Sequence, residues 1–588
     1  MSELRTDWFE KISKECPLPE YPRPQLERKS WICLNGEYDY AVTGETDEIP
    51  EKYDGKILVP FSIESAASGV GKSVTAKDRI WYCRKFSLTE EFSGKRALLH
   101  FEAVDWQCSV WVNSKLVGSH TGGYNPFTFD ITDAVTDGEN ELVIKVYDPT
   151  DEGHQQRGKQ VQQTHGFWYT ATSGIWQTVW LEPVNYCHIE SIKLVPDIDK
   201  NIIGVKVNHT CECGGKLYAK VLDGDKTVFD GEIQADAQIP VPYAKLWSPE
   251  NPFLYSLELT LDCEGEKDTV SSYFGMRKFS IVSDAKGKPR LALNNKPYFQ
   301  RGLLDQGYWP ESQLTPPTDE AMIFDIEKMK ELGFNMLRKH IKTEPRRWYY
   351  HCDRLGMLVW QDMISGGEYI GNILAGVLPN LSINVKDNTE FMHKSFKRGE
   401  AAWREEFKAE LFEMIDNLYN SVSVCCWVPF NEGWGQFDAK EIAEKVKEYD
   451  PTRFVDHASG WHDQKGPDFR SMHRYILPVT PPTPVSKKGR PFVLSEYGGY
   501  SWNIQNHVWN HKKSFGYIMF SNSKALSKAY AFLHKTQIIP LIKLGLCATV
   551  YTQVSDVEYE VNGIYSYDRK VLKLDKDMLI DINSKLTY

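Results

Sequence analysis

Two short segments of the sequence place a glutamate directly after an apolar run. Glu432 stands in Val428-Pro-Phe-Asn-Glu-Gly-Trp, and Glu496 stands in Leu494-Ser-Glu-Tyr-Gly-Gly. A pair of carboxyl groups suits glycosidic bond cleavage, because one protonates the leaving oxygen while the other attacks the anomeric carbon or activates water. A carboxyl separation of ~5–5.5 Å favours the retaining route. Either motif alone also fits a salt bridge at a rim, so the prediction requires a fold that brings both glutamates together.

The second part of the chain is predicted to supply that fold. From about residue 285, strand-like runs alternate with amphipathic helices, as βα units require. Eight strand candidates occupy residues 298–303, 334–338, 357–362, 422–428, 453–457, 471–475, 491–495 and 546–551. Their number predicts a (β/α)8 TIM barrel, whereas a doubly wound sheet, the structural alternative, usually has fewer strands. The runs are followed by no glycine-rich phosphate motif, which argues against nucleotide binding.

Such a barrel would bring the two glutamates to one place. Catalytic groups of these barrels lie at the carboxyl ends of the strands. Glu432 follows the fourth predicted strand and Glu496 ends the seventh, and these two strands face each other across the barrel mouth. The sequence therefore predicts that both carboxylates converge on one bond.

The part of the chain before the predicted barrel has the pattern of β structure. Residues 109–120 alternate apolar and polar side chains around Asn113-Ser114, which predicts a hairpin. Many short strands with turns between them indicate a sandwich or jelly roll. We predict a multidomain chain with an N-terminal β jelly-roll sugar-binding domain (1–185), an immunoglobulin-like β-sandwich (186–283) and a catalytic barrel (284–588).

Composition excludes several classes of partner. The net charge of −11 argues against nucleic acid, and no apolar stretch reaches the ~20 residues of a membrane span. The N-terminal residues lack the apolar core of a signal peptide. The twelve cysteines are scattered, and neither Cys211/Cys213 nor Cys425/Cys426 has metal-ligand or disulfide-framework spacing. We therefore expect free thiols, a cytoplasmic location, and neither a metal nor a cofactor.

Nearly the whole chain resembles glycoside hydrolase family 2, which includes β-galactosidases, β-glucuronidases and β-mannosidases. The matching segments in the first part are Tyr21-Pro-Arg-Pro-Gln-Leu, Trp81-Tyr-Cys-Arg-Lys-Phe, Gly122-Gly-Tyr-Asn-Pro-Phe and Ser173-Gly-Ile-Trp-Gln-Thr-Val-Trp-Leu-Glu. Those in the barrel are Gly333-Phe-Asn-Met-Leu-Arg, Cys352-Asp-Arg-Leu-Gly-Met-Leu-Val-Trp and Phe430-Asn-Glu-Gly-Trp-Gly. This many matches in order is specific to a family.

The resemblance implies a retaining exo-β-glycosidase. By it, Glu432 is the acid/base, Glu496 is the nucleophile, and Asn431 hydrogen-bonds the sugar 2-hydroxyl. Arg338 matches a family position from which a paired hydrogen bond could fix the nucleophile, although a structural salt bridge is the alternative. Tyr475 could donate a hydrogen bond to Glu496, or be a rim aromatic.

Further candidate residues have weaker signals. His340 and His473 could line the sugar pocket, and Asp362 could bind sugar hydroxyls or cap the next helix. The candidate stacking platforms, each of which also fits a core position, are Trp434, Trp461 and Tyr551. The segments 153–169 and 364–400, the second read as a long polar loop, are expected to shape the pocket rim.

Departures from the family pattern bear on which sugar is bound. The family's β-galactosidases carry a histidine three residues after the arginine, where this chain has Ile341. Its glucuronidases carry an Asn-x-Lys motif after strand eight, where this chain has Glu560, whose charge would repel a uronate. Asn522-Ser-Lys524 spells that motif before a late helix and is interpreted as coincidence. We predict a neutral substrate such as a β-galactoside.

Other functions stay open at this point. A β-glucuronidase, another β-uronidase or a β-mannosidase of the same family would use the same two glutamates. A catalytically inactive carbohydrate-binding protein is an alternative of a different class, although both glutamates are present in their motifs. A homo-oligomer is possible, and the sequence does not distinguish hydrolysis from transglycosylation.

Overall fold

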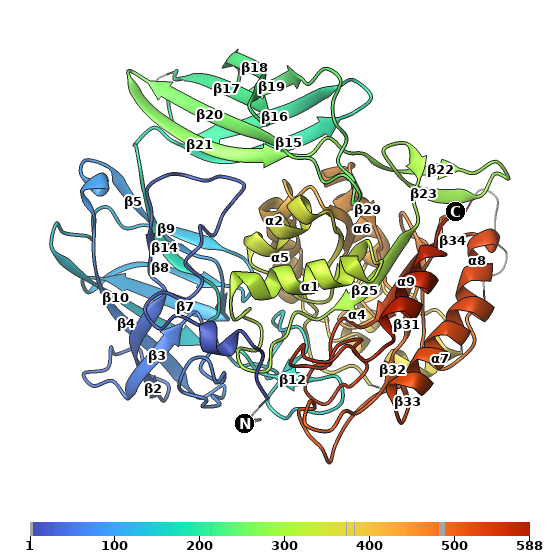
Figure 1. Ribbon diagram of the computed structural model, residues 1–588. Coiled ribbons are helices and arrows are strands. Elements are labelled where there is room, and N and C mark those ends of the chain that lie inside the picture. Colours follow the sequence, from blue (N-terminus) through green and yellow to red (C-terminus); the bar gives the residue numbers. More distant parts are fainter. Residues whose placement is uncertain (1–3, 213, 372, 382, 481–488) are drawn as a thin grey trace.

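The computed structural model describes residues 4–212, 214–371, 373–381, 383–480 and 489–588 (Figure 1). The N-terminal part is an antiparallel β-sandwich, in which a six-stranded and a four-stranded sheet enclose a buried apolar core. The six-stranded sheet has the order β3 (Gly55–Val59), β2 (Gly36–Thr43), β4 (Arg79–Ser87), β10 (Glu139–Tyr147), β7 (Gln107–Val112) and β8 (Lys115–Thr121). The four-stranded sheet has the order β1 (Ile32–Cys33), β14 (Val179–Val184), β5 (Arg96–Phe101) and β9 (Phe127–Asp130).

The hairpin predicted at residues 109–120 is confirmed. Strands β7 and β8 pair antiparallel, and the two residues between them, Asn113 and Ser114, have φ of 49° and 66°. Positive φ at both central residues is the geometry of the tight turn that matches strand twist.

A second, smaller sandwich follows in the chain. One sheet has the order β15 (Ile189–Asp197), β16 (Ile202–His209) and β19 (Asp236–Pro240). The other has the order β18 (Lys226–Ile233), β17 (Lys216–Asp223), β20 (Tyr255–Cys263) and β21 (Glu266–Phe274). Burial along β20 alternates, because successive side chains of a strand point to opposite faces of its sheet.

A small sheet connects this sandwich to the last domain. It contains β22 (Phe279–Ser283), β23 (Pro289–Leu293) and β24 (Lys296–Pro297), and its apolar side chains pack against strands of the barrel. The pairing of β22 with β23 spans the predicted boundary at residues 283 and 284. The domain boundaries stay a prediction.

The last domain is a barrel of eight parallel strands, in the regions predicted from the sequence. Their order is β29 (Phe454–Val455), β28 (Val424–Val428), β27 (Leu358–Asp362), β26 (Met336–Lys339), β25 (Gln300–Asp305), β34 (Leu546–Thr552), β31 (Phe492–Gly498) and β30 (Arg470–Arg474). The first and last strands of this order are joined through Asp468, whose backbone N–H donates to the Val455 carbonyl (2.5 Å). The sheet is therefore a barrel, and the doubly wound alternative is wrong.

Helices surround these strands (Figure 1). They include α1 (Asp319–Glu331), α2 (Arg346–Leu355), α5 (Ala401–Leu418), α6 (Ala439–Tyr449), α7 (Ser523–Leu533), α8 (Ile539–Leu544) and α9 (Lys576–Ser584). Thr318 caps α1 by accepting a hydrogen bond from the Ala321 N–H, a preferred start for a helix. None of the helices in the described ranges is long and apolar enough to cross a membrane.

The segment 364–400 differs from its prediction as a long loop. It contains a π-helical turn, η3 (Ile373–Val377), followed by α3 (Leu378–Asn380) and α4 (Glu390–Ser395). The Thr389 hydroxyl accepts a hydrogen bond from Met392 N–H and so starts α4. The polar residues that suggested a loop include this cap, so here they begin a helix.

Candidate active site

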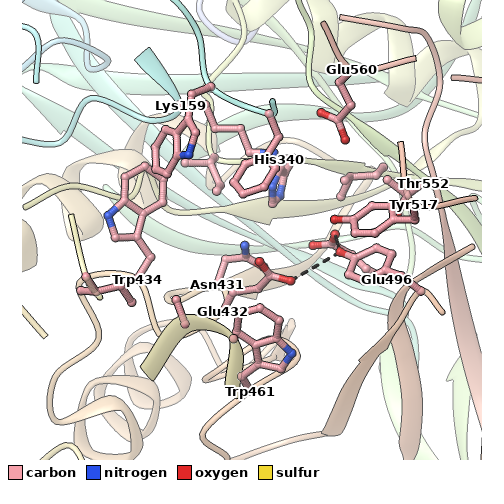
Figure 2. A pocket seen from close by; sticks show the side chains of 18 of the residues that line it. Lys159, His340, Asn431, Glu432, Trp434, Trp461, Glu496, Tyr517, Thr552 and Glu560 are labelled. Atoms are coloured by element: carbon pink, nitrogen blue, oxygen red, sulfur yellow. Dashed lines mark hydrogen bonds between the residues drawn. The ribbon is translucent and has the colours of Figure 1, made fainter. Parts of the chain in front are cut away.

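A cavity of about 370 Å³ opens at the carboxyl ends of the barrel strands (Figure 2). Strand ends contribute its base, and the segments 153–169 and 364–400 contribute walls, as predicted. The predicted site residues that line it are Asn431, Glu432, Glu496, His340, Trp434, Trp461 and Tyr475. Those absent from its lining are Arg338, Asp362, His473 and Tyr551.

Glu432 is held by an unusual backbone turn after β28. Its φ is 52°, in the left-handed region that residues with side chains rarely adopt. The turn is fixed to the segment that follows the next barrel strand, β29, since Glu432 N–H donates to the Ser459 carbonyl (3.0 Å). Strained residues of this kind cluster at active sites, where the surrounding structure must hold them.

Glu496 reaches the cavity from β31, and there a bulge in the strand, rather than a turn, directs the side chain. The pairing of β31 shifts register against both neighbouring strands, at Met472/His473 and between Leu494 and Tyr497. A bulge of this type re-aims a side chain and occurs often beside active sites. The two glutamate side chains differ in exposure, with 25% for Glu432 and 4% for Glu496.

The two carboxylates lie close together across the barrel mouth. One oxygen of Glu432, one of Glu496 and a nitrogen of His473 all lie within 4.8 Å of one another. The Tyr475 hydroxyl lies 3.4 Å from Glu432 Oε1 and donates a short hydrogen bond to Glu496 Oε2. A spacing this short leaves no room for the water that an inverting enzyme places between its carboxyls, ~6.5–9.5 Å apart.

Arg338 contacts the nucleophile candidate differently from the prediction. Its Nη1 donates one hydrogen bond to Glu496 Oε1 (3.0 Å), whereas its paired hydrogen bonds go to Asp362 (2.9 and 3.0 Å). The fork of the guanidinium thus faces strand β27, and one edge reaches Glu496. The predicted paired contact with the nucleophile is wrong.

The charge of Glu496 is set by its neighbours. Burial by itself would raise its pKa, but His473, His340, Arg338 and the Tyr475 hydroxyl outweigh burial and lower the pKa to about 2. Burial lowers the pKa of His340 well below its usual value, so the contribution of that ring fades as the pH rises, whereas Arg338 keeps its charge. The permanent charge of Arg338 therefore keeps Glu496 an anion, the form that a nucleophile requires.

Asn431 is oriented by the same arginine. Arg338 Nη2 donates to Asn431 Oδ1 (2.8 Å). Because a guanidinium can only donate, the amide oxygen must face it, and the amide NH2 faces elsewhere. Asn431 lines the cavity, so this NH2 is available to donate to a sugar hydroxyl.

Asp362 and the two histidines form the layer behind these groups. Asp362 is fully buried and accepts from Arg338 and from His340 Nδ1 (2.7 Å), so it neither meets the sugar nor caps a helix. His473 joins Glu432 Oε1 through Nδ1 (2.7 Å) and Ser459 Oγ through Nε2 (3.2 Å). His473 therefore positions the acid/base candidate from outside the cavity.

The predicted stacking residues divide into two groups. Trp434 and Trp461 line the cavity. Tyr551 is 1% exposed and packs against Tyr497 and Tyr530 behind the barrel strands, so the prediction of a sugar platform there is wrong. Its position near the end of β34 indicated the mouth, but the side chain points to the core.

The first sandwich also contributes to the cavity, which sequence reasoning did not assign to particular residues. Lys159, Phe167 and Trp168 line it. The preceding segment is fastened to the barrel, because Gln156 donates to Glu410 (2.7 Å) and the Arg157 and Gly158 N–H groups donate to the Ser365 carbonyl. Contacts between segments this distant in sequence leave no local pattern.

Three further lining residues follow late strands. Tyr517 stacks on Tyr475 with ring centroids 3.9 Å apart, and Thr552 ends β34. Glu560, noted from the sequence as a charge unfavourable to uronates, is also in the lining. Its carboxylate accepts from the Tyr169 hydroxyl and from Asn562 Nδ2 (2.9 Å), which fixes its orientation.

Tyr475→Phe should lower kcat/KM about 10–100-fold, because a hydrogen bond to a charged group contributes ~1.5–3 kcal/mol. Loss of the donor should also raise the Glu496 pKa from about 2, so the acid limb of the pH–rate profile should move to higher pH. Pre-steady-state and pH–rate measurements check this. Tyr500→Phe, which changes a half-buried tyrosine outside the cavity lining, is the control. An unchanged acid limb would contradict the assigned contact.

Family models match each part of the chain in order. "Glycosyl hydrolases family 2, sugar binding domain" matches residues 41–183, "Glycosyl hydrolases family 2" matches 187–277, and "Glycosyl hydrolases family 2, TIM barrel domain" matches 288–515. The matched ranges correspond to the two sandwiches and most of the barrel.

Known proteins are similar to the chain over part or all of its length. A β-galactosidase of Thermoanaerobacter pseudethanolicus is 27% identical over 394 residues, 63% of this chain and 48% of that protein. One of Halalkalibacterium halodurans is 24% identical over 395 residues, 65% of this chain and 36% of that protein. The chain thus spans half or less of the length of these curated relatives.

Solved structures of similar length share the fold. A Ruminococcus gnavus β-glucuronidase has a TM-score of 0.76 at 16% identity, covering 97% of this chain and 99% of that one. A family 2 β-galacturonidase of Eisenbergiella tayi has a TM-score of 0.70 at 18% identity, covering 96% and 98%. With three family models matching consecutive parts of the chain, this protein belongs to glycoside hydrolase family 2.

Proposed function

We propose that the protein is a retaining exo-β-glycosidase that removes a terminal neutral sugar, with β-galactosides as the first candidates. One observation carries the proposal. Glu432 and Glu496 present carboxylate oxygens within 4.8 Å and share the hydroxyl of Tyr475. The β-galactosidases among the relatives support the choice of sugar.

The geometry suggests how the two steps divide between the glutamates. Glu496, an anion held by Arg338 and Tyr475, attacks the anomeric carbon, while Glu432 gives its proton to the glycosidic oxygen. The leaving alcohol departs and a glycosyl ester on Glu496 remains. Glu432, now ionised, removes a proton from water, which attacks the same carbon and releases the sugar with its configuration retained.

The shape of the site supports action on chain ends. The cavity is walled by the first sandwich, through Lys159 and Trp168, and by the 364–400 segment, through Tyr369 and Ile370. Leu304, at the end of β25, also lines it. A pocket with walls from both domains suits one terminal sugar ring better than the middle of a polymer.

Two charged side chains in the cavity determine which sugars bind. Lys159 and Glu560 lie on the side of the cavity away from Trp461 (Figure 2). Among the described residues Lys159 makes no ion pair, and its ammonium lies 5.7 and 5.6 Å from the ring centroids of Phe167 and Tyr169. An ammonium donates to hydroxyl oxygens and a carboxylate accepts from hydroxyl hydrogens, so the pair suits neighbouring sugar hydroxyls.

A panel of aryl β-glycosides tests this proposal with the wild type, Lys159→Met and Glu560→Gln. We expect the wild type to prefer a neutral β-hexoside. Each substitution should lower its kcat/KM about 10–100-fold, because each removes a charge-assisted hydrogen bond. Glu560→Gln should also reduce the ratio of kcat/KM for the neutral glycoside to kcat/KM for the corresponding uronide, since the substitution removes the charge that repels the uronide.

A β-uronidase is the second candidate, and Lys159 is the observation that favours it. The β-glucuronidase and β-galacturonidase folds are similar to this one, and an unpaired ammonium could bind a sugar carboxylate. In that case the wild type would prefer a uronide, and Lys159→Met would lose activity on the uronide while keeping activity on neutral glycosides. If the wild type hydrolyses none of the glycosides, the result would instead favour the alternative of a catalytically inactive carbohydrate-binding protein.

A further inference from the structure

Large apolar side chains are exposed to solvent around the mouth of the cavity. The 364–400 segment contains six of them, and no other stretch of that length among the described residues contains as many. They are Tyr369, Ile373, Val377, Leu381, Ile383 and Phe391. An exposed apolar side chain that occurs singly needs no explanation, but a group of them beside a cavity is typical of a binding surface.

The exposed side chains of η3 are not used to pack the fold. Leu374 and Ala375 pack against the barrel core. Ile373 and Val377, on either side of them in the sequence, are 67% and 51% exposed, and Val377 also lines the cavity. Folding therefore leaves apolar area in contact with water, and a bound ligand that covered this area would be stabilised by doing so.

The same segment packs against the turn that carries the acid/base candidate. His462 Nε2 lies 2.9 Å from the Leu374 carbonyl oxygen, and a Cβ added at Gly433 would lie 2.7 Å from His462 Cδ2. A Cβ added at Gly435 would lie 2.6 Å from the Gly366 carbonyl oxygen. These close approaches place the exposed apolar side chains on the acid/base side of the cavity.

The bond that is cleaved in the proposed reaction is directed toward this wall. Glu496 attacks the anomeric carbon, so the leaving oxygen departs from the opposite side, where Glu432 protonates it. In Figure 2, Trp434 and Glu496 appear on opposite sides of Glu432. The group attached to the leaving oxygen would therefore extend toward Trp434, Tyr369 and Val377, which all line the cavity.

The aromatic side chains of this wall also contact one another. Trp168 packs edge-on against Trp434, with ring centroids 4.5 Å apart, and against Tyr369 at 6.3 Å. Apart from Tyr369, the described residues between positions 369 and 377 have no polar group in their side chains. A second sugar placed here would lose hydrogen bonds from its hydroxyls to water, and such a wall could not replace them.

We propose that the group released from the sugar is a large apolar alcohol rather than a second sugar. This inference rests on the proposed hydrolysis of β-glycosides and adds the chemical class of the leaving group. The cavity of about 370 Å³ is within the ~300–1,000 Å³ of pockets that hold drug-sized ligands. It admits the sugar and the first part of such an alcohol, while the exposed side chains at the mouth contact the rest.

Ethyl and octyl β-glycosides of the sugar that the panel selects test this proposal. Their leaving alcohols are almost equally acidic and differ mainly in apolar area. We expect wild-type kcat/KM to be about 10-fold or more higher for the octyl glycoside, mostly through KM, because each buried methylene group contributes roughly a fourfold gain. A disaccharide with the same terminal sugar should be a poorer substrate than the octyl glycoside. Equal kcat/KM for ethyl and octyl glycosides would overturn the proposal.

Val377→Ser tests the location of the apolar site. The ratio of kcat/KM for the octyl glycoside to kcat/KM for the ethyl glycoside should fall about 5–20-fold, because the substitution removes an aliphatic contact. Leu116→Ser is the matched control, since it changes a 55% exposed apolar residue on β8, outside the cavity lining, and it should keep the wild-type ratio. The same ratio in wild type and Val377→Ser would show that this wall does not bind the leaving group.

The neutral naphthalene dye prodan provides a readout that does not depend on turnover. Its emission should increase and shift to shorter wavelength with the wild type and with Glu496→Gln, and less with Val377→Ser. The octyl glycoside should displace the dye at a lower concentration than the ethyl glycoside. Such displacement without turnover would support the apolar site and contradict the proposed hydrolysis. Turnover with neither dye displacement nor preference for the octyl glycoside would contradict the apolar site alone.

A second copy of the chain is the other occupant that could cover these side chains. Sedimentation of the wild type, Val377→Ser and Leu116→Ser distinguishes the two cases. The same mass for all three proteins would support a site for the leaving group. A wild-type dimer that only Val377→Ser dissociates would show a contact between copies and overturn the proposal.

Discussion

Glu496→Gln is expected to abolish turnover of every glycoside, with kcat lower by about 10⁴-fold or more, because its amide cannot form the glycosyl ester. Arg338 and Tyr475 donate to different oxygens of Glu496, so the single amide oxygen keeps the hydrogen bond from Arg338 while the new NH2 can donate to the Tyr475 hydroxyl. The fold and sugar binding should therefore survive. Steady-state rates together with binding of the sugar product, followed by calorimetry, would separate lost chemistry from lost binding.

Chemical rescue identifies the role of this carboxylate. Glu496→Gly opens a space on the side of the ring from which the nucleophile attacks, so azide should restore turnover of an activated aryl glycoside and give the α-glycosyl azide. Glu441→Gln, on the exposed surface of α6, should have wild-type rates. More than a hundredth of wild-type activity in Glu496→Gln would show that another group is the nucleophile.

Glu432→Ala has the second largest expected effect, and its size should depend on the leaving group. For alkyl glycosides, whose leaving oxygens need a proton, kcat/KM should fall about 10²–10⁴-fold. For aryl glycosides with acidic phenols the first step should be nearly normal and the second slow, so a burst of phenol should precede a slow steady state. Stopped-flow absorbance would measure both phases.

Azide again tests the assignment, now with the opposite stereochemistry. In Glu432→Ala it should attack the glycosyl ester on Glu496 and give the β-glycosyl azide. His473→Gln, which changes the partner that positions Glu432 at 2.7 Å, should show a milder form of the same leaving-group dependence. Equal losses for alkyl and aryl substrates in Glu432→Ala would contradict its role as the acid.

The barrel and the meeting of Glu432 with Glu496 were predictable from the sequence because their signals are local. Each inner strand of a parallel barrel is buried on both faces, so it appears as a short apolar run, and all eight runs were found. Glu432 and Glu496 follow directly from two of them. The contact of Tyr475 with Glu496 followed from the same placement at a strand end.

Side-chain direction and long-range contacts were not predictable. Tyr551 and Asp362 stand at strand ends as predicted, but one points to the core and the other is enclosed by Arg338 and His340. Lys159 reaches the cavity only because the first sandwich docks on the barrel. Periodicity reports which residues are buried along an element, but not which distant element packs over it.

The docking of the first sandwich also bears on how sugar preference could diverge among related genes. The two glutamates proposed to break the bond are encoded in the barrel, whereas Lys159 is encoded in a segment that precedes the barrel by well over a hundred residues. A recombination event between homologous genes could exchange this contact in one step and leave the reaction intact. The gene segments for the first sandwich and for the barrel therefore both determine the pocket, and we expect substrate range to depend on the evolutionary origin of both segments.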